Sequence, residues 1–243
     1  MDYNITKLPL FQSCGSDFFH AIESQSQNLL LEKNQILFLQ EEKASRFFFI
    51  KSGWIKLFRE TLDGTQAVID ILPAGHIFAE NSIFNDNAYP YSAEAAEHSE
   101  VISIPLSLLK TQLETNPKFA LDMLCDMAQQ KRGKDQELEH RTIQNAPQRI
   151  GCFLLRLVNQ NTQGPLTIHL PYDKTLIAAR LGMQPETFSR GLMKLKAETG
   201  MEIKGATVAL KSIQQLSDYA CAACSSEFPC KDLKSKTCQQ QWL

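Results

Sequence analysis

The sequence predicts an α+β protein built from three successive parts. Short apolar segments separated by turn residues fill 29–105, a helical pattern covers 106–143, and two short helices around a glycine precede a hairpin in 174–210. We therefore expect a β-rich domain over 1–106, a long connecting helix over 107–145, a helix-turn-helix domain over 146–216 and a cysteine-rich tail over 217–243.

The N-terminal part has the composition of many short strands. Segments 36–39, 47–50, 55–58, 67–71 and 101–104 are rich in β-branched and aromatic residues, which favour strands. Turn signals separate them, and Asp63-Gly64 is a strong hairpin signal. Regularly spaced short strands of this kind predict a barrel, a roll or a sandwich.

The middle part predicts a helix that starts at Asn116-Pro117, because proline is tolerated in the first turn. Leu124, Met127 and Leu138 belong to a heptad-like spacing that would join two helices in a dimer. Only the first half of this repeat is apolar. The alternative is a helix that packs on its own domain.

The C-terminal part has the element order of a winged helix. Pro147 separates a helix over 149–158 from the long one, and a strand over 166–170 follows. Helices over 174–181 and 185–195 flank Gly182, which permits a left-handed backbone in the tight turn. Small Ala178 allows the helices to approach, and Pro185 suits the first helical position. A hairpin over 202–204 and 207–210 completes the order.

The second of these helices separates an apolar face from a polar one. At about 100° per residue, Glu186, Ser189 and Arg190 share one face, and the opposite face carries Phe188, Leu192 and Leu195. An arginine can read guanine, a glutamate can accept from cytosine N4, and a serine can bind a base or a phosphate in the major groove. Candidate phosphate-contacting or positioning residues are Lys174, Thr187, Lys194 and Lys196. The alternative is an ordinary amphipathic helix with a solvated charged face.

The charge distribution agrees with a nucleic-acid partner. Residues 144–217 hold nine basic and four acidic residues, a net charge of +5, whereas the rest of the chain carries −7 of the total −2. A basic module on an acidic body would attract phosphate. The sequence shows no apolar run long enough to span a membrane and no secretory signal, so we expect a cytoplasmic protein. No catalytic motif stands out, so we expect no enzyme.

The segment LPYDKTLIAARLGMQPETFSR (170–190) resembles the helix-turn-helix of the CRP/FNR superfamily, and most of all its FNR-type branch, which includes the dissimilatory nitrate respiration regulators. FFFIKSGWIKLFRETLDGTQ (47–66) and ILPAGHIFAENSIF (71–84) extend the resemblance to about residues 8–216. It implies a cyclic-nucleotide-binding-type β-roll, a long dimerisation helix and a winged helix-turn-helix. It also implies a homodimer that reads a TTGAT–N4–ATCAA palindrome in double-stranded DNA, with RNA polymerase as a further partner.

The resemblance also locates an effector pocket. Cyclic-AMP-binding relatives carry Gly-Glu-Leu/Ala and then Arg-Ser/Thr-Ala, where this chain has Phe78-Ala79-Glu80 and Tyr91-Ser92-Ala93. Tyrosine cannot supply the charged fork that arginine offers to phosphate. We therefore expect that a cyclic nucleotide is not the effector, and keep a cyclic-nucleotide or other small-effector regulator as the alternative.

The tail carries the pattern C-x2-C-x5-C-x7-C, formed by Cys221, Cys224, Cys230 and Cys238. Thiolates at this spacing can bind zinc or an iron–sulfur cluster. Some Bacillus-type relatives have a C-terminal cysteine group, so the resemblance implies a [4Fe-4S] cluster. Alternatives are zinc or a thiol–disulfide switch, no cofactor, or haem bound in the β-rich domain through His20, His76 or His98. We expect a regulator that responds to oxygen or nitric oxide. The rival is a metal-binding module with a vestigial DNA-binding domain.

Overall fold

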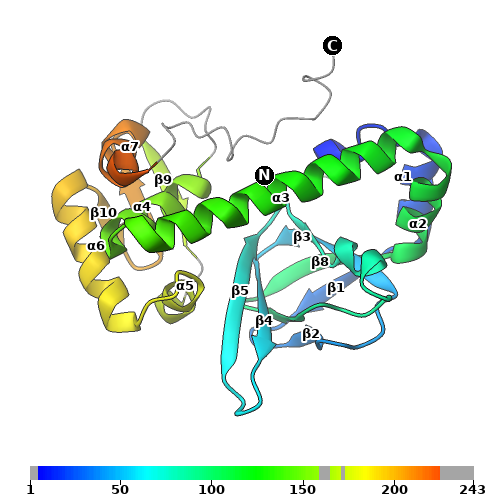
Figure 1. Ribbon diagram of the computed structural model, residues 1–243, viewed down its shortest axis with the longest axis horizontal. Helices are drawn as coiled ribbons and strands as arrows, with labels where there is room; N and C mark the ends of the chain where they lie inside the picture. The colour runs from blue at the N-terminus through cyan, green and yellow to red at the C-terminus, as the bar shows by residue number, and fades with distance from the viewer. Residues whose placement is uncertain (1–4, 159–164, 171–172, 225–243) are drawn as a thin grey trace. The chain divides into compact units, whose positions relative to one another are not determined.

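The computed structural model describes residues 5–158, 165–170 and 173–224. Within them the chain forms two compact units, of which the first ends at Met127 and the second begins at Ala128 (Figure 1). The α+β class and the order of β-roll, long helix and helix-turn-helix that the sequence predicted are confirmed. None of the described helices combines the length and the apolar character needed to cross a membrane.

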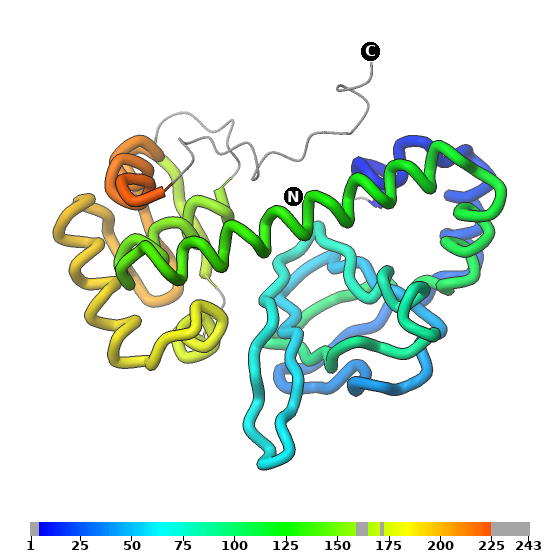
Figure 2. Tube along the Cα trace, in the orientation of Figure 1, coloured from blue at the N-terminus to red at the C-terminus, as the bar shows by residue number. Residues whose placement is uncertain are grey.

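Two four-stranded antiparallel sheets form the β-roll of the first unit, in the orders β1-β8-β3-β6 and β2-β7-β4-β5. Each strand segment expected from the sequence lies largely or wholly on one of these strands. Figure 2 shows the β4–β5 hairpin projecting from the roll. The predicted Asp63-Gly64 turn lies between the paired residues Glu60 and Gln66. The strands are β1 (Gln27–Leu31), β2 (Ile36–Phe38), β3 (Arg46–Ser52), β4 (Trp54–Glu60), β5 (Gln66–Pro73), β6 (Ile77–Phe78), β7 (Ser92–Ala95) and β8 (Ser99–Pro105).

Helices cover part of the roll. They are α1 (Ser16–Gln25) and α2 (Leu106–Thr115), with the short 3-10 turns η1 (Ile5–Lys7), η2 (Pro9–Phe11) and η3 (Glu80–Phe84). Strand β3 is buried from Phe47 to Ile50 without alternation, because one face meets the roll interior and α2 packs on the strand. The ring of Phe119, from the next helix, stacks on Phe11 with centroids 6.2 Å apart.

The expected helix over 107–145 is two helices, α2 and α3 (Pro117–Ile143). Asn116 separates them, and its side-chain Oδ1 accepts a hydrogen bond from the Phe119 amide at 3.2 Å. Pro117 occupies the first helical position, as the sequence predicted, because a proline lacks the N–H that this position would leave unpaired.

The second unit contains the end of α3 and the winged helix. Its further elements are α4 (Ala146–Arg156), β9 (Leu166–His169), α5 (Lys174–Arg180), α6 (Pro185–Thr199), β10 (Glu202–Lys204), β11 (Thr207–Leu210), α7 (Ile213–Ala220) and η4 (Cys221–Ala223), and its sheet has the order β10-β11-β9. Helix α4 starts with a capping box between Asn145 and Gln148.

The expected boundary between domain and tail at 216/217 was wrong. It falls inside α7, whose Leu216 and Ala220 are buried in the core of the winged helix, with Cys221 packed against that core. Gly151 in α4 explains how α7 approaches so closely, because a Cβ at this position would lie 2.8 Å from the Cβ of Ala220. The ordered domain therefore includes the first part of the supposed tail.

Candidate DNA-binding surface and effector pocket

The helix-turn-helix is fixed at its start and at its turn. The Asp173 side chain caps α5 by accepting a hydrogen bond from the Thr175 amide at 2.8 Å. Ala178 is fully buried, and its carbonyl accepts from the Met183 amide at 3.0 Å, which closes the turn. Gly182 has a φ of +63°, the left-handed conformation that the sequence predicted for this glycine.

Helix α6 has the two faces that its sequence predicted. Phe188, Leu192 and Leu195 are buried in the core of the second unit. Glu186, Ser189 and Arg190 are exposed on the opposite face. The structure therefore brings the three candidate base-reading side chains together on one solvent-facing ridge.

A glycine that sequence reasoning missed holds α6 in place. A Cβ at Gly191 would lie 2.9 Å from Cδ1 of Ile150 in α4, so a larger residue would require the Ile150 side chain to shift. An isolated glycine inside a helix costs about 1 kcal/mol relative to alanine. A glycine inside the predicted helix could therefore have indicated close packing at this position.

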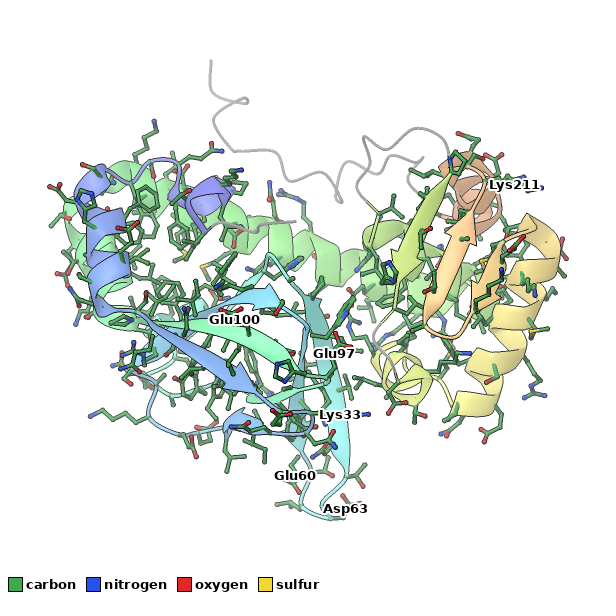
Figure 3. The ribbon with its side chains drawn as sticks, turned by 180° about the vertical axis from the view of Figure 1, so that it is seen from behind. Lys33, Glu60, Asp63, Glu97, Glu100 and Lys211 are labelled. Carbon is green, nitrogen blue, oxygen red and sulfur yellow. The ribbon has the colours of Figure 1, made fainter. Side chains whose placement is uncertain are left out.

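The candidate phosphate-contacting residues differ in exposure. Lys174 is exposed at the start of α5, Lys194 and Lys196 are exposed on α6, and Thr187 is half-buried. Lys211 also projects from the surface, between β11 and α7 (Figure 3). The exposed lysines are accessible to a DNA phosphate, and their role in binding stays a prediction.

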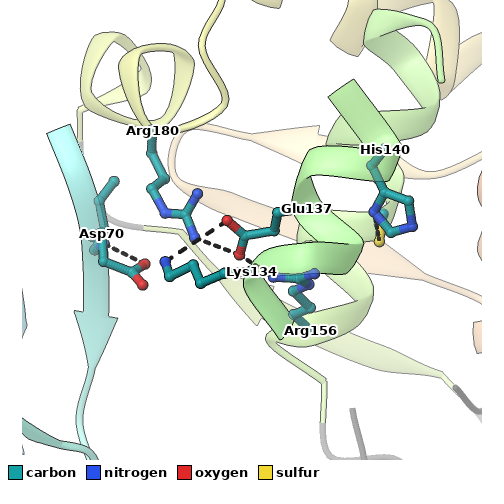
Figure 4. A network of polar contacts seen from close by, with 8 residues as sticks. Asp70, Lys134, Glu137, His140, Arg156 and Arg180 are labelled. Atoms are coloured by element: carbon teal, nitrogen blue, oxygen red, sulfur yellow. Dashed lines mark hydrogen bonds and ion pairs between the residues drawn. The ribbon is translucent and has the colours of Figure 1, made fainter. Parts of the chain in front are cut away.

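Two of the nine basic residues counted in 144–217 form ion pairs with a glutamate of the same unit. Arg180 in α5 is only 7% exposed, and its Nη2 donates to Oε1 of Glu137 in α3 at 2.7 Å. Arg156 in α4 forms an ion pair with the same oxygen, and Nζ of Lys134 lies 3.8 Å from the other (Figure 4). These two arginines therefore add less to the field toward DNA than the count of nine cations suggests.

Burial and the neighbouring cations have opposite effects on the pKa of the Glu137 carboxyl. Burial raises the pKa, but the hydrogen bond and charge of Arg180, with Lys134 and Arg156, outweigh burial and hold it below its usual range. The carboxylate is thus ionised near neutral pH and compensates the two arginines.

Arg141 of α3 lies beside the turn of the helix-turn-helix. A Cβ at Gly182 would lie 3.7 Å from Cζ of this arginine. Arg149 in α4 is half-buried, and its burial, with the charge of Arg141, lowers the pKa of its guanidinium. The sequence did not predict this contact, because it joins elements far apart in the chain.

The β-roll brings three of the four candidate effector residues, Phe78, Glu80 and Tyr91, close together. The Ala79 amide, between Phe78 and Glu80, donates to the Tyr91 hydroxyl at 2.9 Å. Burial, and to a lesser extent the charge of Glu80, raises the pKa of Tyr91, so the phenol is neutral. Ser92 is buried and accepts from the Gln40 amide at 2.9 Å.

Aromatic rings fill the space next to this hydrogen bond. The centroid of Phe38 lies 6.2 Å from those of Phe78 and Tyr91, and Phe48 stacks on Phe78 at 5.2 Å. Tyr91 therefore supplies no cation for a phosphate, and its hydroxyl already accepts the Ala79 N–H. The residues present do not fit the charged clamp of a cyclic-nucleotide site.

Only half of the cysteine pattern falls within the described residues. Cys221 and Cys224 are described, whereas Cys230 and Cys238 lie outside them. Sγ of Cys224 lies 3.3 Å from Nε2 of buried His140, and Nδ1 of that histidine lies 3.5 Å from Sγ of Cys152. Burial, then the charge of Arg156, lowers the pKa of His140 and favours its neutral form.

These contacts bear on a metal centre at the tail. Within the described residues no three histidine, cysteine or acidic side chains converge as metal ligands. Cys221 and Cys224 can provide two thiolates, so a four-ligand site would need the cysteines beyond them. The contacts of His140 could not be read from the sequence, because Cys152 and Cys224 follow it by 12 and 84 residues and lie on other elements.

The histidines considered for haem lie at the surface of the first unit. His20, His76 and His98 are all exposed. Nδ1 of His76 lies 3.2 Å from the Pro73 carbonyl, and Nδ1 of His98 lies 3.5 Å from the Glu32 carboxylate. Each has the environment of a surface histidine.

The candidate dimer residues on α3 differ in exposure. Leu124 and Leu138 are 63% and 64% exposed, whereas Met127 packs against the hydrophobic core of its own β-roll. Leu121, which the heptad of the sequence omitted, is exposed one turn before Leu124. Leu121 and Leu124 thus form an apolar strip on the outer face of the helix in the first unit.

Comparison with known proteins agrees with this architecture. Residues 29–116 match the model of the cyclic nucleotide-binding domain, and residues 148–219 match that of the Crp-like helix-turn-helix domain. A solved structure from Ruegeria pomeroyi, named provisionally as a cyclic nucleotide binding protein, is 35% identical, with a TM-score of 0.67 over 87% of this chain and 92% of that one.

Two curated relatives represent different branches. The cyclic AMP receptor protein of Thermus thermophilus is 26% identical over 87% of this chain and 96% of its own length. The fumarate and nitrate reduction regulatory protein of Vibrio cholerae is 25% identical over 78% of this chain and 77% of its own.

The two domains and these relatives define a transcription regulator that binds double-stranded DNA, and not an enzyme. The chain belongs to the CRP/FNR superfamily.

Proposed function

We propose that this protein acts as a homodimer and reads a TTGAT–N4–ATCAA palindrome through α6. The observation that carries the proposal is the exposed ridge of Glu186, Ser189 and Arg190, opposite a face that the domain core covers. Arg190 would donate to guanine O6 and N7, Glu186 would accept from cytosine N4, and Ser189 would bind a base or a phosphate.

The test compares two duplexes of equal length. Fluorescence anisotropy at about 0.15 M salt should show binding to the palindrome at least 10³-fold tighter than to a scrambled duplex, the low end for specific DNA readers. The protein is purified without oxygen, so that its cofactor state is preserved. Equal affinity for the two duplexes would contradict sequence-specific reading. Recruitment of RNA polymerase is then measured by transcription from a promoter that carries the palindrome.

Dimerisation is supported by α3. Leu121 and Leu124 expose an apolar strip that a second copy of the helix would cover, and Leu138 continues exposed apolar character on the same helix. A palindrome requires a two-fold dimer, because each half-site needs one α6. Sedimentation should therefore find dimers in the DNA-bound state.

The signal that we propose is redox or gaseous, with oxygen or nitric oxide as the effector. Two observations support this class over a cyclic nucleotide. Neutral Tyr91 stands where a phosphate clamp needs a cation, and its hydroxyl accepts the Ala79 N–H. Cys221 and Cys224 hold thiols at the edge of the DNA-binding domain.

A cyclic nucleotide is the second candidate, because the matching domain model and one relative carry that name. Calorimetric titration with cyclic AMP separates the two. We expect no heat of binding at concentrations up to about 1 mM, since the neutral phenol of Tyr91 does not compensate the charge of the phosphate. Micromolar binding would overturn the redox or gas proposal.

The cofactor is tested on protein purified without oxygen. A [4Fe-4S] cluster at the tail should give a broad visible absorption band and equal amounts of iron and sulfide, and Cys224→Ser should lower both. Haem would instead give a sharp Soret band, and zinc a featureless spectrum with bound zinc. A metal-free, featureless protein that binds DNA alike before and after exposure to oxygen and to nitric oxide would contradict the proposed signal.

A further inference from the structure

Met193 is an exposed apolar side chain in the middle of the proposed reading surface. It is 63% exposed, and among the described residues from 146 to 224 it is the one large hydrophobic side chain with such exposure. It follows Glu186 by seven residues and Arg190 by three. At about 100° per residue, it lies roughly 20° from Glu186, between the directions of Ser189 and Arg190.

The two lysines of α6 show which way this side chain faces. Relative to Glu186, Lys194 lies near +80° and Lys196 near −80°, at about 100° per residue. Both are exposed. A helix that places these cations against the phosphates on the two sides of the major groove points its central line, including Met193, at the base pairs.

The base edges offer one apolar partner in that groove. Thymine presents a C5-methyl group, whereas the other edge groups are hydrogen-bond donors or acceptors. A methionine thioether has no donor, but it is flexible and polarisable and adapts its shape to a methyl group. Burial against a base methyl also explains why an apolar side chain stands on a ridge that is otherwise polar.

We propose that Met193 contacts the C5-methyl group of one thymine in each half-site and so adds a thymine preference to the polar readout. This inference rests on the proposed function. Met193 lies about 4.5 Å further along the helix than Arg190, or about one base step. In TTGAT, both base pairs beside the guanine contain a thymine, so the contact falls on one of these two.

The experiment replaces single thymines by deoxyuridine, which removes only the methyl group. Each thymine of TTGAT and of its complement is replaced in turn, symmetrically in both half-sites. For the unchanged protein, replacement at one of the two thymines beside the guanine should weaken binding about fourfold per half-site, as expected for one buried methyl group. Replacement elsewhere should change the affinity less.

Met193→Ala should bind the thymine and deoxyuridine duplexes alike at that position, and Met193→Leu should keep part of the preference. Lys194→Ala is the matched control, because it should weaken binding to all duplexes and leave the thymine-to-deoxyuridine ratio unchanged. Thermal unfolding verifies that the variants fold.

The outcomes distinguish the two proposals. If the unchanged protein prefers TTGAT to scrambled DNA but Met193→Ala keeps the full thymine preference, or if no thymine beside the guanine shows one, the Met193 contact is wrong and the proposed function stands. If the unmodified palindrome is not preferred at all, both proposals fail.

Discussion

Tyr91 shows at the residue scale how one side chain changes what a β-roll can bind. The resemblance implies that its phenol replaces the arginine of relatives with a cyclic-AMP site, and its oxygen accepts a hydrogen bond from the Ala79 amide. The Ala79 N–H thus has a hydrogen-bond partner without any ligand. The sequence predicted the loss of the phosphate clamp, because this follows from the residue type alone. The bond to Ala79 could not be predicted, since it depends on the loop geometry.

Tyr91→Phe should destabilise the first unit by about 1–3 kcal/mol, because the Ala79 N–H would be buried without a partner. Urea unfolding followed through tryptophan fluorescence measures this change. Tyr219→Phe, at a partly buried position of the other unit, is the matched loss of one phenol oxygen and should cost less than about 0.5 kcal/mol. Equal effects would show that the amide has another partner.

Arg190→Ala should cost about 1–3 kcal/mol of binding to the palindrome and relax the choice of base at the guanine it reads. Lys194→Ala should weaken binding to palindrome and scrambled DNA by similar factors and reduce the slope of affinity against salt by about one. Anisotropy on duplexes with a changed guanine measures both. A base preference that survives Arg190→Ala would assign the reading of that guanine to another side chain.

At the scale of elements, the local sequence predicted those features that depend on turn propensity or on helical period. The hairpin at Asp63-Gly64, the helix start at Pro117 and the faces of α6 follow from turn propensity or helical period, and the structure confirms them. Strands β1, β6 and β7 escaped prediction, as did α1. Strand β6 has two residues, and β7 consists of Ser, Ala and Glu, so their strand conformation comes from pairing with β3 and with β2 and β4.

The carboxylate of Glu137 joins three helices, and its removal should be costly. Glu137→Gln should destabilise the protein by about 3 kcal/mol at pH 7, because Arg180 would remain buried without its counter-ion. The lowered pKa of Glu137 means that this stabilisation is present above about 4.5, the ordinary value, and is lost as the pH falls through the pKa of the folded state.

Chemical denaturation at several pH values tests this expectation. The difference between the unchanged protein and Glu137→Gln should stay constant while the pH is above about 4.5 and shrink as the pH is taken lower. Glu198→Gln, at an exposed position of α6, is the control and should leave stability within about 0.5 kcal/mol. A pH-independent difference would mean that packing, and not charge, accounts for the loss.

The apolar strip of α3 predicts an assembly defect. Leu124→Glu should shift the protein toward monomer, because it places a charge where a second helix would cover Leu121 and Leu124. Sedimentation velocity at several concentrations measures the shift. Gln130→Glu adds the same charge roughly 180° around the helix from Leu121 and should leave the dimer intact. A dimer that tolerates Leu124→Glu would place the interface elsewhere.

At the scale of the whole molecule, sequence reasoning recovered the fold class, the order of the domains and the helix-turn-helix. It did not recover the contacts that join distant segments. His140 meets Cys152 and Cys224, and Glu137 meets Arg156 and Arg180, across separations that no local period records. The domain boundary near 216 was misplaced for the same reason, since α7 belongs to the core through its packing on α4.

The shared carboxylate of Glu137 also has a mechanical meaning. Because arginines from α4 and α5 both pair with one carboxylate oxygen on the last turns of α3, we expect a rotation of these turns to move α4 and α5 with them. If a signal in the first unit rotated α3, the ion pairs of Glu137 would transmit that rotation to the winged helix. A variant without these ion pairs, such as Glu137→Gln, would then still bind its signal and still bind DNA. The signal would no longer change its affinity for DNA.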